Sequence, residues 1–394
     1  MSTVIKFKVK KALSVLSLAI VSLASGQTFI QAYQDRANMV TQTNITSLLQ
    51  SFSNFGVKTT GSVANNNTLA WLKNQYLSYG YTISDMTEDT FTSGSSTSNN
   101  LIVTKTGTVY PNIYVIICGH YDTINSPGVS DNGSGTSILL EAARILKDVP
   151  TEYSIKFIHF SGEEQGLLGS NHYVNNVVFN NNVRQLTLKV VFNIDQVGGK
   201  IGNPNTTITC ESDQSGQTGN NAASLAMTQQ LANCTTLYSP LLVNMSNAFA
   251  SDYVPFENKG DIITGFYETP VSGNQHTPND TFANVDPVYV FKVGKAAVGA
   301  LQHFAVATTT LSVNETQKNT DQIKIYPNPV KDILYIDTPS SVKNFKVEIT
   351  DVSGKSVLKS ENQNEVNVSG ISSGNYVCTI SFNGGTTSRK IIIE

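Results

Sequence analysis

The sequence predicts an α/β domain with a parallel central sheet, followed by a much smaller all-β module. Apolar runs of strand length alternate with segments of helical periodicity through most of the 394 residues. A strand–helix–strand order of this kind is typical of parallel sheets. Beyond residue 322 the helical pattern gives way to short alternating strands separated by Gly and Asn turns, which favours a small β-sandwich.

Apolar residues at helical spacing predict the helices of the first domain, and continuous apolar runs predict its strands. The predicted helices are residues 44–55, 67–79, 137–147, 222–232 and 286–305. The predicted strands are residues 101–103, 113–118, 154–160, 186–192 and 261–267. Gly80 is a candidate C-terminal cap, and Pro287 fits the first turn of a helix. The Ser- and Thr-rich stretch at residues 90–100 is expected to be a loop.

The composition and the N-terminus indicate an exported protein. The net charge is −3, from 26 basic and 29 acidic residues, and gives no reason to expect a nucleic-acid partner. A lysine-rich start, an apolar run at residues 12–23 and Ala24-Ser25-Gly26 form the pattern of a signal peptide at residues 1–26. The alternative is a membrane anchor, but the apolar run is shorter than the roughly 20 residues that span a bilayer. We therefore expect secretion and no stable membrane span.

The four cysteines do not suggest a thiolate metal site, because the sequence contains no Cys-x-x-Cys pair. Cys118 lies in a predicted buried strand and is expected to be a core residue. Cys210 and Cys234 could pair in an exported protein, and the sequence leaves this open.

Three of the predicted strands end in a histidine or a carboxylate. His120 and Asp122 follow the first of these strands, Glu163 and Glu164 follow the second, and Asp195 follows the third. Ligands bind at the carboxyl edge of open α/β sheets, and a histidine brought together with carboxylates there indicates a metal site. Asp122 is a candidate partner for the second ring N–H of a ligating His120. Of the two adjacent acids, one can bind a metal while the other stays free as a base.

Two loops add further candidates, and every candidate also has an ordinary explanation. Asp131 lies in a Gly-rich loop before a predicted helix, where it could bridge two cations or simply cap the helix. His276 lies in a polar loop at residues 275–281 and could be a surface histidine. The other acids could form a solvated turn or an ion pair. The joint occurrence of these residues at strand ends favours the metal site.

Five motifs resemble, in order, those of the secreted di-zinc aminopeptidases. They are Gly119-His120-Tyr121-Asp122, Ser130-Asp131-Asn132-Gly133, Ser161-Gly162-Glu163-Glu164, Asn193-Ile194-Asp195 and His276-Thr277. The resemblance covers about residues 40–305. It implies a three-layer α/β/α fold with a mixed, mainly parallel central sheet for a catalytic domain at residues 27–306.

The resemblance also implies two zinc ions per chain. The implied ligands are Asp131, Glu164 and His276 for one ion, and His120, Asp131 and Asp195 for the other. Asp131 would then bridge the ions, and Glu163 would be the general base that takes the proton of a metal-activated water. The implied activity is hydrolysis of N-terminal residues from peptide substrates. Such families often have Ser-Asp-His where this chain has Ser251-Asp252-Tyr253, a departure that concerns supporting contacts and the substrate pocket.

Three other functions remain open at this point. A similar fold and similar ligands serve glutaminyl cyclases, which use a single zinc ion, and carboxypeptidase-type relatives. The domain could also be a non-catalytic binding protein, although the presence of Glu163 with the full ligand set argues against this.

The remaining residues predict a linker and a second module. Residues 307–322 are rich in Thr, Asn and Gln and are expected to be the linker. In residues 323–394 the clearest strands are residues 333–335, 346–349, 376–380 and 390–393. The motifs Tyr326-Pro327-Asn328-Pro329, Asp351-Val352-Ser353-Gly354-Lys355 and Ser373-Gly374-Asn375-Tyr376 resemble the C-terminal sorting domain of the type IX secretion system. This resemblance implies the type IX secretion machinery as a partner and an extracellular or cell-surface location. A carbohydrate- or surface-binding module is the alternative, but no exposed aromatic platform stands out in the sequence.

Overall fold

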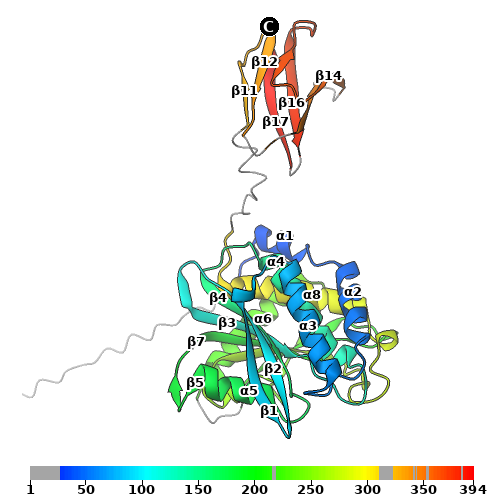
Figure 1. The fold of residues 1–394 in the computed structure, drawn as a ribbon, viewed down its shortest axis with the longest axis vertical. Helices are drawn as coiled ribbons and strands as arrows, with labels where there is room; N and C mark the ends of the chain where they lie inside the picture. Colours follow the sequence, from blue (N-terminus) through cyan, green and yellow to red (C-terminus); the bar gives the residue numbers. More distant parts are fainter. Residues whose placement is uncertain are drawn as a thin grey trace, which may run out of the picture. The chain divides into compact units, whose positions relative to one another are not determined.

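The computed structural model describes residues 27–394, except for residues 215–218, 310–322, 340–341, 343, 352–354 and 383–384. The predicted signal peptide and most of the predicted linker lie outside the described residues. The chain divides between Thr309 and Thr310 into two compact units (Figure 1).

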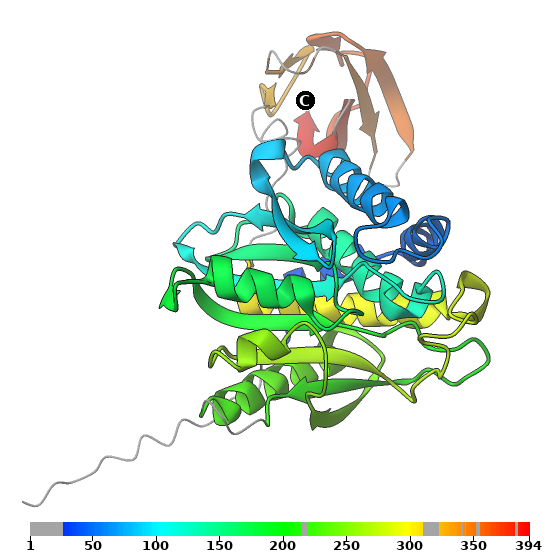
Figure 2. The ribbon, with the colours of Figure 1, turned by 60° about the horizontal axis from the view of Figure 1, so that its bottom comes forward.

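An eight-stranded sheet with helices on both faces makes up the first unit (Figures 1 and 2). Its strands are β1 (Met86–Ser93), β2 (Ser96–Lys105), β3 (Tyr110–His120), β4 (Tyr153–Phe160), β7 (Thr187–Ile194), β8 (Thr207–Ser212), β9 (Leu242–Asn247) and β10 (Ile263–Thr269). Its α-helices are α1 (Gln31–Ala37), α2 (Gln42–Ser53), α3 (Val63–Ser78), α4 (Ser134–Leu146), α5 (Leu168–Tyr173), α6 (Asn221–Tyr238), α7 (Val254–Glu257) and α8 (Pro287–Ala305). A separate hairpin joins β5 (Phe179–Asn180) to β6 (Val183–Arg184).

The sheet is mixed and the unit has three layers, as predicted. The strand order is β1-β2-β4-β3-β7-β10-β8-β9, and the central strands β4, β3, β7 and β10 run parallel to one another. Along β3, Val115 and Ile117 belong to the core that contains the buried faces of α2, α4 and α8. Ile116 and Cys118 belong to a second core on the other face, which contains Phe256 of α7. Because side chains alternate along a strand, the sheet is covered on both faces.

Capping residues explain where the helices begin. The side chain of Thr41 accepts a hydrogen bond from Asn44 N at the start of α2, and Ser62 accepts one from Asn65 N at the start of α3. Helix α3 therefore begins at Val63, four residues before the predicted start at residue 67. Gly80 follows the end of α3 with a φ of +90°, which is the left-handed conformation expected of a C-terminal cap.

Two predictions for the strands were wrong. The stretch expected to be a loop at residues 90–100 forms most of the hairpin of β1 and β2, in which Ser93 pairs with Ser96. Its Ser and Thr side chains fit a strand as well as a loop, since Phe91 is buried while its neighbours stay exposed. Strands β8 and β9 were not predicted, because polar residues predominate in β8 and alternate irregularly with apolar ones in the largely exposed β9.

Hydrogen bonds connect the N-terminal helix of the first unit to its C-terminal residues. Tyr33 in α1 donates its hydroxyl to Ala307 O at 2.5 Å, and Arg36 donates to Thr308 O at 2.8 Å. Thr308 N in turn donates to Pro150 O at 2.9 Å. Residues 307 and 308 therefore pack with the first unit, although the predicted linker begins at residue 307.

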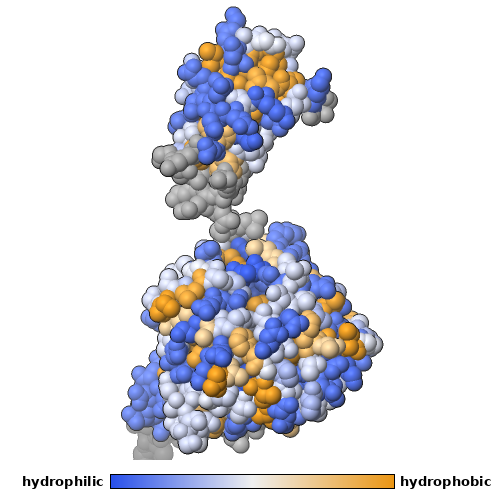
Figure 3. Space-filling view, turned by 45° about the vertical axis from the view of Figure 1, so that its right-hand side comes forward, coloured by the Kyte–Doolittle hydropathy of each residue, from blue (hydrophilic) through white to orange (hydrophobic). Residues whose placement is uncertain are grey.

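The second unit is a β-sandwich. One sheet contains β11 (Lys324–Tyr326), β12 (Ile333–Asp337) and β15 (Glu365–Asn367), and the other contains β14 (Ser356–Glu361), β13 (Phe345–Thr350), β16 (Gly374–Phe382) and β17 (Gly385–Ile393). Both sheets contribute to one core, as shown by Leu334 of β12 and Ile349 of β13. Hydrophobic residues also gather on one outer face of this unit (Figure 3).

An exposed aromatic pair lies on the second unit, contrary to the prediction. The rings of Tyr326 and Tyr335 stack with centroids 5.7 Å apart, and both side chains are exposed. The pair joins β11 to β12, where the two residues are register partners.

All four cysteines are buried and unpaired, so Cys210 and Cys234 do not form the disulfide that the sequence left open. None of the helices that the structure describes combines the length and apolar character needed to cross a bilayer.

Candidate metal centre

The structure brings all five predicted metal ligands together at the carboxyl edge of the sheet. The ligands form two groups: His120, Asp131 and Asp195, and Asp131, Glu164 and His276. Within each group the candidate ligand atoms lie within 4.8 Å of one another. Strands β4, β3 and β7 are neighbours, so residues at or just beyond their ends meet there.

Asp131 belongs to both groups and presents its two carboxylate oxygens to different histidines. Its Oδ1 lies 3.1 Å from His120 Nε2, and its Oδ2 lies 3.1 Å from His276 Nε2. Burial acts to raise the pKa of Asp131, but hydrogen bonds from the two histidines lower it below its usual value. Asp131 is therefore placed to bridge two cations.

Asp280 holds the loop that carries Asp131. The backbone N–H groups of Ser130 and Asp131 donate to its two carboxylate oxygens at 2.7 and 2.9 Å. Burial raises the pKa of Asp280 to about 6, and the two backbone donors oppose this rise. No local sequence pattern points to Asp280, because its side chain contacts a backbone segment that is distant in the chain.

His120 contacts Asp122 mainly through the backbone. Its Nδ1 lies 3.1 Å from the Asp122 carbonyl oxygen and 3.7 Å from Asp122 Oδ1. The Asp122 carboxylate instead accepts the backbone N–H groups of Glu163 and Glu164, each at 3.3 Å. Asp122 thus fixes the histidine ring with its carbonyl group and the Glu163–Glu164 turn with its carboxylate, whereas the sequence predicted only a carboxylate contact to the ring.

The two adjacent glutamates have different surroundings. Glu164 Oε2 lies 2.9 Å from His276 Nε2, whereas Glu163 belongs to neither ligand group. Burial, with neighbouring carboxylates such as Asp195, raises the pKa of Glu163 to about 10. Burial and the charge of Asp131 raise the pKa of Glu164 to about 8. Carboxylates perturbed in this way are ionised at neutral pH only when cations lie nearby.

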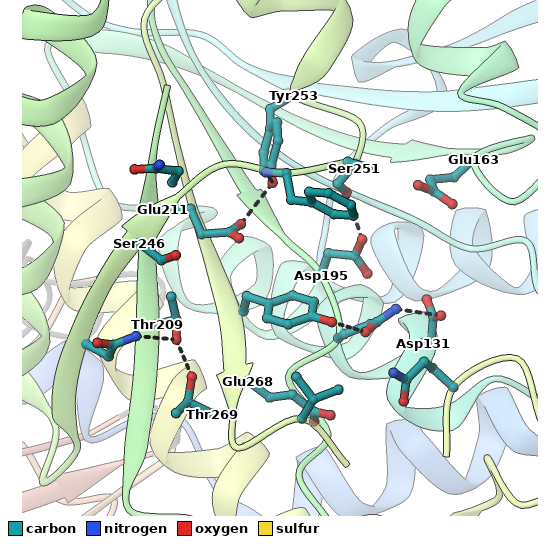
Figure 4. Close-up of a pocket in the computed structure, with 18 of the residues that line it drawn as sticks. Asp131, Glu163, Asp195, Thr209, Glu211, Ser246, Ser251, Tyr253, Glu268 and Thr269 are labelled. Carbon is teal, nitrogen blue, oxygen red and sulfur yellow. Dashed lines mark hydrogen bonds between the residues drawn. The ribbon is translucent and has the colours of Figure 1, made fainter. Parts of the chain in front are cut away.

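Three polar side chains support the ligands (Figure 4). Gln196 Nε2 donates to Asp131 Oδ2 at 2.8 Å, and Tyr267 donates its hydroxyl to Gln196 Oε1 at 2.7 Å. Ser251 donates its hydroxyl to Asp195 Oδ2 at 2.7 Å. The sequence analysis named Ser251 only as part of a motif and missed Gln196, although Gln196 directly follows Asp195.

Tyr253, which stands where a histidine is often found, is buried away from the ligand groups. Its hydroxyl donates to Glu211 Oε2 at 3.0 Å and accepts the backbone N–H of Phe249 at 2.9 Å. The predicted change in supporting contacts therefore concerns Glu211, a residue that the sequence analysis did not single out.

A cavity of about 630 Å³ opens directly beside the ligands. Asp131, Glu163, Asp195 and His276 line one end of it. The remaining wall is formed mainly by residues with polar side chains, together with three apolar residues: Gln196, Thr209, Glu211, Asn244, Ser246, Asn247, Phe249, Ala250, Ser251, Tyr253, Tyr267, Glu268, Thr269, Val271 and Gln275 (Figure 4). Asp131, Asp195 and His276 line this accessible cavity, and His120 and Glu164 complete the two ligand groups behind it. Two imidazoles and three carboxylates are a donor set that suits catalytic zinc.

Comparisons with known proteins match both units. The sequence profile of peptidase family M28 matches residues 100–300, and that of the secretion system C-terminal sorting domain matches residues 324–394. The aminopeptidase YwaD of Bacillus subtilis is 33% identical over 219 residues, which cover 52% of this chain and 45% of YwaD. The chain thus spans less than half the length of this curated relative.

Solved structures share the fold at low sequence identity. The LapA aminopeptidase of Legionella pneumophila is 20% identical with a TM-score of 0.61, over 75% of this chain and 80% of LapA. A glutaminyl cyclase of Macrostomum lignano is 15% identical with a TM-score of 0.60, over 72% of this chain and 97% of the cyclase. Because one fold serves both proteins, the fold by itself does not decide the reaction.

Proposed function

Because the chain belongs to peptidase family M28, we propose that it is a zinc-dependent exopeptidase that releases N-terminal residues from peptides. One observation carries the proposal: two ligand groups share Asp131, while Glu163 stands free beside them in the same cavity. The relative named as an aminopeptidase supports the same activity.

The donor set fits two zinc ions per chain. His120, Asp131 and Asp195 would hold one ion, and Asp131, Glu164 and His276 would hold the other. Bound zinc would supply an acidified water and polarise the scissile carbonyl group. Asp131, Glu164 and Asp195 together carry three negative charges when ionised, which two divalent cations would more than balance.

Glu163 is the proposed general base. Its carboxylate accepts a proton from the attacking water as the new C–O bond forms. It then gives this proton to the leaving amine as the peptide C–N bond breaks. Asp122 positions Glu163 by accepting its backbone N–H, and burial favours return of the proton because it raises the pKa of Glu163.

A panel of substrates tests the reaction. We expect the zinc-loaded protein to hydrolyse aminoacyl-anilides with a free α-amine and to leave N-blocked peptides intact. Glutaminyl cyclisation is the second candidate function, because a glutaminyl cyclase shares the fold. Cyclisation of an N-terminal Gln peptide, with a single tightly bound zinc by elemental analysis, would favour the cyclase.

The two ends of the chain support export. The C-terminal sorting domain supports recognition by the type IX secretion machinery, and residues 1–26 carry the pattern of a signal peptide. We infer a secreted or cell-surface enzyme with a catalytic domain that begins at residue 27 and extends to Thr309, a linker up to residue 322 and a sorting domain at 323–394.

A further inference from the structure

We propose that Glu211 makes the cavity selective for peptides whose N-terminal residue has a cationic side chain, lysine or arginine. This inference rests on the proposed function, since it names the substrate class that the same site accepts. It is carried by the position of Glu211 in the sheet, by its single neutral partner and by the chemistry of the cavity wall.

Glu211 stands in a polar section of the sheet that forms one wall of the cavity. Thr209 and Glu211 are two apart on β8, so both side chains project from the same face. Their register partners on β9 are Asn244 and Ser246, which also line the cavity. This part of the wall therefore offers hydroxyl, amide and carboxylate groups to a substrate side chain.

A glycine leaves room for the Glu211 side chain. Gly265 on β10 is the register partner of Glu211 on the other side. A Cβ atom at Gly265 would lie 3.4 Å from Glu211 Oε2 and 3.3 Å from Tyr253 Cε1. The space above Gly265 is thus where the Tyr253 hydroxyl meets Oε2. Figure 4 shows the hydrogen bond between Tyr253 and Glu211. The hydrogen bond orients the carboxylate and leaves Oε1 for a ligand in the cavity.

Among the described residues that line the cavity, Glu211 is the carboxylate that has one neutral hydrogen-bond donor and no assigned role. Asp131 and Asp195 belong to the ligand groups, and Glu163 is the proposed base. Glu268 accepts the backbone N–H groups of Gly199 and Ser272 at 2.7 and 2.5 Å. Among the described residues that line the cavity there is no lysine or arginine.

A cationic substrate side chain would supply what Glu211 lacks. The residue is only 7% exposed, and burial raises its pKa to about 7. A buried carboxylate is costly to ionise unless a positive charge pairs with it. An ammonium or guanidinium group in the cavity provides that charge and forms a charge-assisted hydrogen bond. A leucine side chain would instead leave the carboxylate and the neighbouring amides without a partner.

The alternative is that Glu211 binds the α-ammonium group common to all substrates. The Lys-to-Leu ratio of kcat/KM distinguishes the two roles, because every aminoacyl-anilide carries the α-ammonium group but only some carry a cationic side chain. Loss of a side-chain contact lowers kcat/KM for Lys and Arg substrates selectively, whereas loss of an α-ammonium contact lowers kcat/KM for all substrates alike.

The test measures kcat/KM of the zinc-loaded full chain on the anilides of Lys, Arg, Leu and Ala. We expect the native protein to favour Lys and Arg, and Glu211→Gln to lower the Lys-to-Leu ratio about 10- to 100-fold, as for loss of a charged partner. Glu257→Gln is the matched control. Glu257 is 8% exposed and burial raises its pKa to about 7, but it does not line the cavity. The Lys-to-Leu ratio of kcat/KM in Glu257→Gln should stay within about threefold of the native value.

The other possible results refute either the inference about Glu211 or the proposed function. A native protein that prefers Leu, or a Lys-to-Leu ratio unchanged by Glu211→Gln, refutes the inference but leaves the proposed function intact. An equal loss on all four anilides also refutes it, in favour of α-ammonium binding. Hydrolysis of none of the anilides by the zinc-loaded protein refutes the proposed function itself. Should Glu211→Gln fail to fold, Glu211→Asp keeps the charge and must retain a preference for Lys over Leu.

Discussion

The carboxylate of Asp280 accepts the backbone N–H of Asp131 at 2.9 Å, so the residue shared by both ligand groups is fixed through its main chain. A side chain that holds a ligand in place contributes to metal affinity although it does not touch the metal. Asp280 therefore fixes the main chain from which the Asp131 carboxylate projects.

Replacing Asp280 with Asn should loosen the metal centre. An amide presents one acceptor in place of two, so one of the two backbone donors loses its partner. We expect kcat/KM to fall about 10- to 100-fold and zinc affinity to fall by a similar factor. Competition with a chelator of known affinity measures the second quantity. Asn279→Ala, which changes an exposed neighbour, serves as the control. Native zinc affinity in Asp280→Asn would contradict this role.

Replacing Glu163 with Gln should separate catalysis from metal binding. Glu163 lines the cavity but belongs to neither ligand group. Since the amide keeps the shape of the side chain but accepts no proton, we expect kcat to fall about 100- to 10,000-fold. Elemental analysis should give the same zinc content as the native chain. If the variant keeps most of its activity, Glu163 is not the base.

The metal-free protein should lose stability as the pH rises. Burial raises the pKa values of Glu163 and Glu164 from 4.5 to about 10 and about 8. Between about pH 4.5 and pH 8 the folded state keeps protons that the unfolded chain releases, so the free energy of unfolding falls across this window. After removal of metal by a chelator, activity should be lost and Tm should decrease from pH 5 to pH 8. Glu163→Gln should weaken that decrease. A Tm of the metal-free native chain that did not change between pH 5 and pH 8 would contradict the raised pKa values of Glu163 and Glu164.

The preference for lysine should itself depend on pH. Burial raises the pKa of Glu211 from 4.5 to about 7, so the carboxylate is mostly neutral at pH 6 and mostly ionised at pH 8. The Lys-to-Leu ratio of kcat/KM should therefore rise over this range, while effects common to all substrates cancel. Glu211→Gln should give a flat ratio. A ratio that rises equally in the variant would show that another group is responsible.

A chain that ends at Thr309 should fold and work without the second unit. The unit boundary lies after Thr309, and the five ligands and Glu163 all precede it. We expect zinc content, kcat/KM and Tm of the catalytic unit to match those of the full chain within about twofold. In the native host the shortened protein should stay in the cell envelope. Normal secretion would remove the sorting interpretation, and loss of folding would show that the second unit is needed.

The candidate ligands that the structure brings together could be predicted from the sequence because they sit where apolar strands end. His120 and Asp195 mark the ends of β3 and β7, and the parallel order brings such ends together. The supporting residues were harder to predict. Asp280, Gln196 and Tyr267 act through contacts between segments far apart in the chain, and no local periodicity records such contacts.

The missed strands have a common physical cause. Along β8, Thr209 and Glu211 face the cavity, so the strand lacks the apolar run that marks a strand buried on both faces. Strand β9 lies at the edge of the sheet and is largely exposed, and β1 and β2 are rich in Ser and Thr. The features that hid β8 from prediction are the polar side chains that give the cavity its chemistry.

The contacts of Tyr33 and Arg36 with residues 307 and 308 have a mechanical consequence. If the type IX secretion machinery bound the sorting domain and moved it, the force would reach the catalytic unit at Thr309. The load would pass first to the bonds from Arg36 to Thr308 O and from Thr308 N to Pro150 O. The first bond joins the start of the unit's chain to its end, and the second joins that end to the loop before β4. The candidate ligands lie beyond the opposite, carboxyl ends of β3, β4 and β7. A pulling force during export would therefore stretch the hydrogen bonds of Thr308 before it disturbed the candidate metal ligands.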